Sequence, residues 1–307
     1  MSLVPISATC QQNKSGVNDS HTKVEKKKKK KYRLPKIDLS HWSVTTPELN
    51  AKGGAMNIEP PAILNYATDE RLIPYMYNDS TSGSLVFYAF PSNATTANTK
   101  YTRSELREQM VPGDNNINWT FAQGGYMKGK LAMKEVSKDS DGKYHKVIIM
   151  QIHGRLTDEQ RDLIGQKDNN APPILKIYWD NGKVRVKTKI LKNISATNEE
   201  LLHEDAWDDD NGFNFEQEVG FRNFTLEVKV SEGKMVIVLN NSEYKVYEDV
   251  NMRRWGIFEN YFKAILQIGG ITLISLNLAI LCGKNSYIKN YEIKKLGNKS
   301  IIKGIIV

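Results

Sequence analysis

The stretch KYTRSELREQ places Arg103, Glu105 and Arg107 at every second position. Side chains of a β-strand alternate between its two faces, so in a strand these three charges would share one face. A hydrophobic core has no use for such a face, and a solvated face rarely needs two guanidinium groups beside one carboxylate. The pattern indicates either a binding site for an anion or a cross-strand ion ladder, which would contribute little by itself.

Two other segments with a strand pattern carry polar side chains on one face. In IIMQIHG, Gln151 and His153 share a face, and in ENYFKAI, Tyr261 and Lys263 share a face. If these segments are neighbouring strands, they line a concave sheet face. Guanidinium groups bind carboxylates in bidentate fashion, and a histidine beside an uncharged glutamine can act as a base near neutral pH. Such a face suits a chain of acidic sugars, although a lone histidine on a strand is more often structural.

The segments around these residues predict an all-β fold. Short alternating runs are separated by Gly, Asn, Asp and Pro, which is typical of a β-sandwich or jelly roll. Asn181-Gly182 between two such runs predicts a hairpin. One helical patch lies at 156–165, with Thr157 or Asp158 as its N-cap. Seven segments are candidates for strands: 84–90, 101–109, 146–154, 174–180, 183–190, 224–230 and 234–240.

The positive charge of the chain, +8 in total, comes from two terminal segments. Residues 23–36 carry +8 and residues 284–307 carry +5, so residues 37–283 carry −5. The body is therefore mildly acidic, and no nucleic-acid partner is expected. The six-lysine run at 26–31 is compatible with a polyanion or a membrane surface, but its composition favours a solvated, disordered tether.

The two cysteines, Cys10 and Cys282, have no metal-ligand spacing and imply no disulfide framework. SATC followed by a lysine-rich tether resembles the end of a bacterial lipoprotein signal whose start is missing, so a membrane contact is expected only through a lipid anchor near Cys10. We expect an extracellular or cell-surface monomer. The sequence divides into a disordered leader (1–36), a jelly-roll domain (37–283) and a basic, unassigned tail (284–307).

Two segments have alternative interpretations. Residues 264–283 carry no charge over 20 residues, enough to span a bilayer, but Gln267, Asn277 and three glycines favour two buried strands. Asp208 to Gly212 (DDDNG) resembles a calcium loop, but no bidentate glutamate follows at the required distance. An acidic surface turn is the preferred interpretation.

Three motifs in this order resemble the alginate lyases of polysaccharide lyase family seven, which fold as a β-jelly roll. They are RSELRE (103–108), QIH (151–153) and YFKA (261–264). Supporting segments are LSHWSVTTPE (39–48), WTFAQGGYMKGKL (119–131) and LKIYWDNGKVRVK (175–187). The resemblance spans residues 37–267.

The resemblance implies β-elimination of a 1,4-linked uronate chain, with no metal or organic cofactor. Arg103 and Gln151 would neutralise the C6 carboxylate and stabilise the enolate, and His153 would be the base for guluronate. Glu105, Arg107 and Lys263 would hold the site and the flanking sugars, and Tyr261 matches a tyrosine on the substrate side. The QIH form resembles members that accept guluronate-containing chains, and endolytic cleavage is expected.

The chain departs from the family motif Tyr-Phe-Lys-Ala-Gly-x-Tyr-x-Gln, whose second tyrosine donates a proton to the leaving oxygen. Here the sequence reads YFKAILQ, and Ile265 is the residue expected near that tyrosine's place. The family's closing core strand is not recognisable in residues 271–307, where Ile supplies 9 of 37 residues. This composition suggests a frameshift, a mispredicted junction or degeneration in an AT-rich gene, and an unrelated natural ending is the alternative. The alternative to an active lyase is therefore a catalytically impaired, alginate-binding homologue.

Overall fold

The structure is a computed structural model that describes residues 35–96, 101–268, 272–279, 293–296 and 299–302, with side chains up to Ala264. All of these belong to the compact unit 32–307. The expected leader lies outside the described residues except for its last two, and Cys10 and Cys282 lie outside them too. No helix in the described part is long and apolar enough to cross a membrane.

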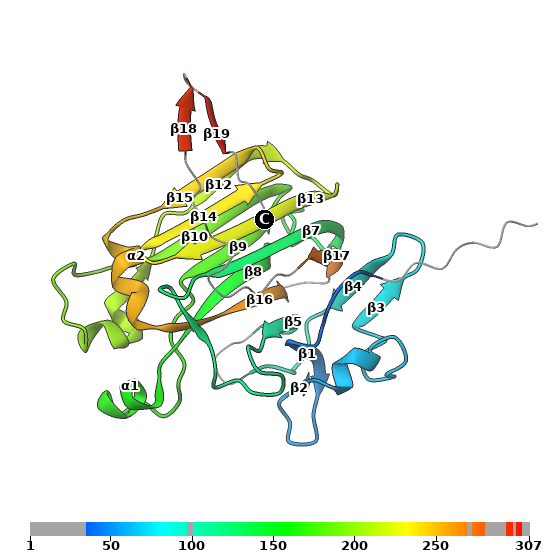
Figure 1. The fold of residues 1–307 in the computed structure, drawn as a ribbon. Helices are drawn as coiled ribbons and strands as arrows, with labels where there is room; N and C mark the ends of the chain where they lie inside the picture. Colours follow the sequence, from blue (N-terminus) through cyan, green and yellow to red (C-terminus); the bar gives the residue numbers. More distant parts are fainter. Residues whose placement is uncertain (1–34, 97–100, 269–271, 280–292, 297–298, 303–307) are drawn as a thin grey trace, which may run out of the picture. The chain divides into compact units, whose positions relative to one another are not determined.

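Two antiparallel sheets form the framework of the described chain (Figure 1). The larger is a ten-stranded sheet, in which β12 pairs with β10 and β6 pairs with β16 beside the main path. In spatial order, the main path is β11 (Trp207–Asp209), β10 (Lys183–Leu191), β9 (Leu175–Asp180), β8 (Val147–Arg155), β16 (Glu259–Ile268), β5 (Arg103–Glu108), β1 (Trp42–Leu49) and β2 (Ala55–Ile58). The two side strands are β12 (Phe213–Glu218) and β6 (Trp119–Thr120).

The second sheet has seven strands within the described residues. In order, these are β15 (Glu243–Tyr247), β14 (Lys234–Leu239), β13 (Phe224–Ser231), β7 (Gly125–Val136), β17 (Thr272–Ala279), β4 (Ser84–Ala89) and β3 (Met76–Asp79). A separate pair is β18 (Ile293–Leu296) with β19 (Lys299–Ile302). The helices are α1 (Asp158–Leu163) and α2 (Val250–Arg254), with 3₁₀ turns η1 (Ala62–Asn65), η2 (Glu200–Leu202), η3 (Glu204–Ala206) and η4 (Trp255–Ile257).

The core is built from the apolar faces of both sheets. Leu106, Ile152 and Phe262 of the ten-stranded sheet are fully buried, as are Met127 and Leu226 of the seven-stranded sheet. Each of these residues alternates along its strand with more polar neighbours, which is the period-two pattern expected of a sandwich strand. The core therefore leaves the other face of the ten-stranded sheet free for polar side chains.

The local signals read from the sequence are confirmed. Asn181 and Gly182 have φ of 48° and 86° and join β9 to β10, as the hairpin prediction requires. Thr157 caps α1, and its side chain accepts a hydrogen bond from the backbone N–H of Gln160 while the Gln160 side chain accepts one from Thr157 N–H. Each of the seven strand candidates corresponds to an observed strand, and the predicted and observed ends differ by at most two residues.

Residues 264–283 form strands as far as they are described, so the strand interpretation is correct there. Although the family's closing core strand is not recognisable in this sequence, β17 lies between β7 and β4. Its register places Leu276 opposite Leu131 on one side and Leu85 on the other. The alternating run TLISLNLA satisfies the strand period without any family motif.

Candidate functional site

Strand β5 carries charges on one face and core residues on the other. Arg103 is 6% exposed and Glu105 is 4% exposed, and Arg107 is partly buried. On the opposite face Leu106 and Glu108 are buried. The predicted charged face therefore exists, and it is largely withdrawn from solvent.

The strand order brings the three predicted segments together, because β16 lies between β8 and β5 (Figure 1). Lys263 on β16 is opposite Arg107 on one side and Gln151 on the other, and Tyr261 is opposite His153. Directly opposed residues share a face of the sheet. We call the resulting surface the polar face, and it comprises Arg103, Glu105, Arg107, Gln151, His153, Tyr261 and Lys263.

Glu105 lies between two cations of the polar face. Its Oε2 is 3.1 Å from Arg103 Nη1, and its Oε1 is 2.7 Å from Lys263 Nζ. Burial alone would raise the pKa of Glu105, but Lys263 and Arg103 lower that pKa below its usual value. One ionised carboxylate thus holds two cations, which leaves this group with one net positive charge.

One buried donor in the group has no hydrogen-bond partner among the side chains and backbone that the structure describes. Arg103 Nε is buried and makes no hydrogen bond to any described residue. A buried, unpaired guanidinium N–H is costly unless a ligand satisfies it. Arg103 therefore has a donor to offer to an anion.

His153 is held in one tautomer. Its Nδ1 lies 2.9 Å from the backbone oxygen of Gly154, which can only accept, so Nδ1 carries the proton and Nε2 is the acceptor. Removal from water, together with the nearby Lys263 ammonium, lowers the pKa of His153 to about 3. Gly154, whose oxygen binds Nδ1, packs closely on the core: a Cβ at this position would lie 2.9 Å from the Trp255 ring. The imidazole is therefore neutral at ordinary pH, with Nε2 available as a base.

Tyr261 connects the histidine to an arginine. Its ring is nearly parallel to the His153 ring, at 16° and with 5.3 Å between centroids. The guanidinium carbon of Arg107 lies 4.0 Å from the centroid of the Tyr261 ring. This cation–π contact fixes the orientation of the phenol beside the imidazole.

Arg107 uses its guanidinium to hold a loop. It donates to the backbone oxygens of Glu108 at 2.7 Å and Asn115 at 2.9 Å, and to Asn118 Oδ1 at 3.2 Å. The loop 109–118 joins β5 to β6 and is fastened to the polar face by these bonds. In this structure both Nη atoms of Arg107 donate to protein oxygens of this loop.

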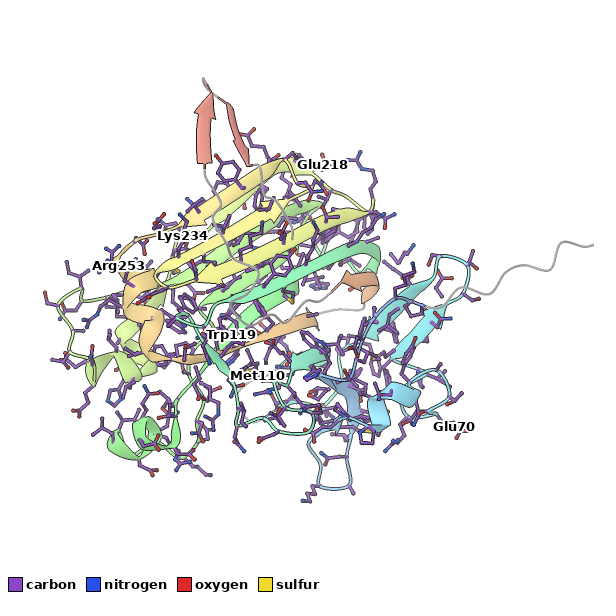
Figure 2. The ribbon with its side chains drawn as sticks, viewed as in Figure 1. Glu70, Met110, Trp119, Glu218, Lys234 and Arg253 are labelled. Atoms are coloured by element: carbon purple, nitrogen blue, oxygen red, sulfur yellow. The ribbon has the colours of Figure 1, made fainter. Side chains whose placement is uncertain are left out.

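Sequence reasoning gave no role to Glu108, which closes a gap in the sheet. β5 ends at Glu108 and β6 begins at Trp119, so the part of β16 between them pairs with β8 on one edge but has no strand partner on the edge that faces β5 and β6. Glu108 Oε2 accepts hydrogen bonds from Phe262 N–H at 2.8 Å and from Trp119 Nε1–H at 2.9 Å. Trp119, labelled in Figure 2, thereby helps to hold the strand that carries Tyr261 and Lys263. The sequence did contain one signal for this role: Glu108 is an acid on the strand face where the alternation of RSELRE predicts an apolar residue.

The backbone register clarifies the altered motif. Counting from Tyr261, the second tyrosine of the family motif falls at position 267, and Ile265 takes the place of the motif's glycine. The expectation that Ile265 stands near the tyrosine's place is therefore corrected to Gln267. In the register, Ile265 is opposite Glu105 and Gln267 is opposite Arg103.

The DDDNG segment lies at the surface, as expected, but Asp208 and Asp209 belong to strand β11 and only Asp210 to Gly212 form a loop. Asp209 Oδ1 lies 2.8 Å from Lys189 Nζ. Asp210 accepts hydrogen bonds from Thr188 and from Gly212 N–H. Among residues with described side chains, no group of three His, Cys, Asp or Glu is arranged to hold a metal ion.

The sequence model of a known family, described as alginate lyase, matches residues 37–265, which is more than half of the chain. The chain belongs to the alginate lyase family. This match covers RSELRE, QIH and YFKA, the motifs that form the polar face. A comparison with curated protein sequences found no match.

Solved structures of alginate lyases share the fold. A variant of the family 7 alginate lyase A1-II′ in complex with substrate (GGMG) is 25% identical, with a TM-score of 0.62 over 82% of this chain and 97% of that chain. A1-II′ at 1.0 Å is 26% identical, with a TM-score of 0.61 over 81% and 97%. An alginate lyase from Pseudomonas aeruginosa is 18% identical, with a TM-score of 0.58 over 80% and 100%, and supports the fold alone. The predicted all-β sandwich is confirmed.

Proposed function

We propose that this member of the alginate lyase family cleaves alginate by β-elimination at the polar face. The observation that carries the proposal is His153, whose Nδ1–H is bound to the Gly154 oxygen and whose Nε2 is left as a neutral base. It lies on the same face as a buried group of cations with one positive charge in excess. A base beside a carboxylate-binding cluster is the combination that uronate elimination requires.

The chemistry explains why both parts are needed. The C5 proton of a uronate is only weakly acidic, and its removal places negative charge on the C6 carboxylate as an enolate. Arg103, through its unpartnered Nε–H, and Gln151 bind that carboxylate and stabilise the developing charge. His153 Nε2 takes the C5 proton, the C4–O bond breaks, and a C4=C5 double bond forms.

The leaving oxygen must receive a proton, and Tyr261 is placed to give it. The motif's usual tyrosine is replaced by Gln267, whereas the phenol of Tyr261 lies directly across from His153. The Tyr261 hydroxyl donates its proton to O4, and the proton taken up by His153 then returns to the phenolate through solvent. His153 therefore accepts one proton and Tyr261, on the adjacent strand, supplies one, so the elimination is balanced in protons.

The finer features of the activity follow from the same geometry and from the family likeness. A separate base and acid suit guluronate, where the C5 proton lies opposite the leaving oxygen, so we expect guluronate-containing chains to be cleaved, and cleaved internally. Because such polymers are found outside cells, the proposal includes an extracellular or cell-surface location and action as a monomer.

The alternative function is alginate binding without cleavage, which the replacement of the second tyrosine by Gln267 favours. A binding protein would need the cations but would have no use for a neutral histidine with a directed Nε2. The ultraviolet absorbance of the unsaturated product, measured separately on polyguluronate and polymannuronate, distinguishes the two. A rise on polyguluronate supports the lyase, whereas binding with no rise on either polymer supports the alternative.

A further inference from the structure

The polar face continues beyond β8 as a row of cations. On β16, Lys263 is opposite Arg107 on one side and Gln151 on the other. Gln151 is in turn opposite Lys176 on β9, and Lys176 is opposite Lys187 on β10. Neighbouring strands are about 4.8 Å apart, so the row crosses five strands with a regular spacing. We call these five residues the cationic row.

At the β9–β10 end of the cationic row, two lysines lie next to each other. Lys176 and Lys187 are directly opposed, an arrangement that destabilises a sheet. Asp209 is the carboxylate beside them, but it lies 2.8 Å from Lys189 Nζ and 4.0 Å from Lys187 Nζ. Burial lowers the pKa of Lys176, and Lys189 and Lys187 add to that effect against the opposing influence of Asp209.

This arrangement is unfavourable in the free protein and favourable around an anion. Three ammonium groups, those of Lys176, Lys187 and Lys189, face the carboxylate of Asp209, and Glu204 is a second carboxylate that acts on Lys176. One positive charge therefore remains in excess. Lys176 and Lys187 are only partly buried, and an anion lying on the sheet can reach them. Each would then gain a charge-assisted hydrogen bond, and their mutual repulsion would fall.

We propose that Lys176 and Lys187 bind carboxylates of sugar units that flank the cleaved bond, so that the polyuronate lies across β16, β8, β9 and β10. The inference rests on the proposed function for the identity of the polymer. A 1,4-linked uronate presents one carboxylate per sugar, at a repeat similar to the spacing of strands. A neutral polymer of the same linkage has nothing to offer these lysines.

Binding is measured by calorimetry with oligoguluronate, in the full chain carrying His153→Ala so that the ligand stays intact. Lys176→Gln and Lys187→Gln are each expected to weaken binding about tenfold, the value of one charged hydrogen bond. Lys130→Gln is the matched control, since Lys130 is an exposed lysine of β7 in the other sheet, and binding should not change. A neutral 1,4-linked glucan should not bind.

Thermal unfolding of the same variants separates binding from folding. Removing one of two opposed ammonium groups should leave the midpoint unchanged or raise it. A variant that carries both Lys176→Gln and Lys187→Gln is measured in the same way. If it binds oligoguluronate as tightly as the Lys130→Gln control, the cationic row is not part of the site.

The proposed function can fail separately. If the unmodified chain binds alginate without forming unsaturated product, the lyase proposal fails and the lysine variants still decide the role of the row by binding. If the chain cleaves alginate and the lysine variants bind normally, the lyase proposal stands and the inference about the row fails. If no oligouronate binds to the chain, both fail.

Discussion

Lys263 Nζ lies 2.7 Å from Glu105 Oε1, and both side chains are less than one-tenth exposed. The other oxygen of Glu105 holds Arg103. A buried ion pair adds little net stability, but removing one partner leaves an uncompensated buried charge. Glu105 therefore sets the positions of two cations that the proposed reaction uses, from a place where it need not touch the reacting atoms.

Glu105→Gln should lower both activity and stability. Two buried cations would lose their carboxylate, at a cost of about 3 kcal/mol in the free energy of unfolding, and kcat/KM should fall by more than about tenfold. Glu227→Gln is the matched control, because Glu227 lies 2.8 Å from Lys229 Nζ and 3.6 Å from Lys128 Nζ in the other sheet. The control should lose stability without losing kcat/KM. Equal losses of activity in the two variants would contradict a special role for Glu105.

The pH dependence of kcat/KM should lack the usual histidine transition. Because burial and Lys263 lower the pKa of His153 to about 3, the base is neutral well below its ordinary pKa of 6.5. We expect kcat/KM to show no acid-side decline near pH 6.5, since this parameter reports the free enzyme. The unfolded chain binds a proton at this histidine below 6.5 and the folded chain does not, so stability from this group falls as pH decreases from 6.5 towards about 3. A histidine-like limb near pH 6.5 would contradict the assignment of a neutral, partly buried base.

Glu108 should make stability fall as pH rises. Burial raises the pKa of Glu108 to about 7 from an ordinary value of 4.5, so the folded chain keeps a proton that the unfolded chain releases. The free energy of unfolding should therefore decrease between about pH 4.5 and 7, by roughly 3 kcal/mol from this group. Glu108→Gln keeps an acceptor for Phe262 N–H and Trp119 Nε1–H and removes the titration. In the parent this fall opposes the rise with pH that His153 contributes below 6.5, whereas in the variant the His153 contribution is unopposed. Denaturant unfolding across this pH range should therefore show stability rising more steeply with pH in the variant than in the parent, and identical slopes would rule out this assignment.

Tyr261→Phe should lower kcat by about a hundredfold or more, because it removes the proposed proton donor while keeping the ring between His153 and Arg107. Tyr144→Phe, in a ring cluster with Trp179 and Phe221, serves as the control and should keep full activity. Adding Gln267→Tyr to Tyr261→Phe returns a phenol to the family position and should restore part of the lost rate. Full turnover by Tyr261→Phe alone would show that another group protonates the leaving oxygen.

The sequence predicted those parts of the fold that depend on neighbours in the chain. Strand alternation in RSELRE predicted that Arg103 and Glu105 share one face. The Asn-Gly pair at 181–182 predicted the hairpin, because both residues readily adopt the positive φ that its turn requires. The motifs also predicted that β5, β8 and β16 lie together, since their polar residues have a use only as one surface.

The missed features depend on contacts between distant segments. Glu108 accepts from Phe262 N–H, 154 residues away, and no local pattern signals that a backbone donor there lacks a partner. Likewise β17 pairs with β4 and β7, although its own motif is unlike the family's. Lys176 and Lys187 read as ordinary alternating lysines until the register places them in one row with Gln151.

The central claim is that His153 is the base of an alginate lyase. The measurement that tests it most directly is the initial rate of product absorbance on polyguluronate for the parent chain and for His153→Ala, with thermal unfolding recorded for both. The account predicts turnover by the parent, loss of turnover by more than about a hundredfold in the variant, and the same folded structure. Substantial turnover by a folded His153→Ala variant would contradict the assignment of the base, and no turnover by the parent would contradict the lyase itself.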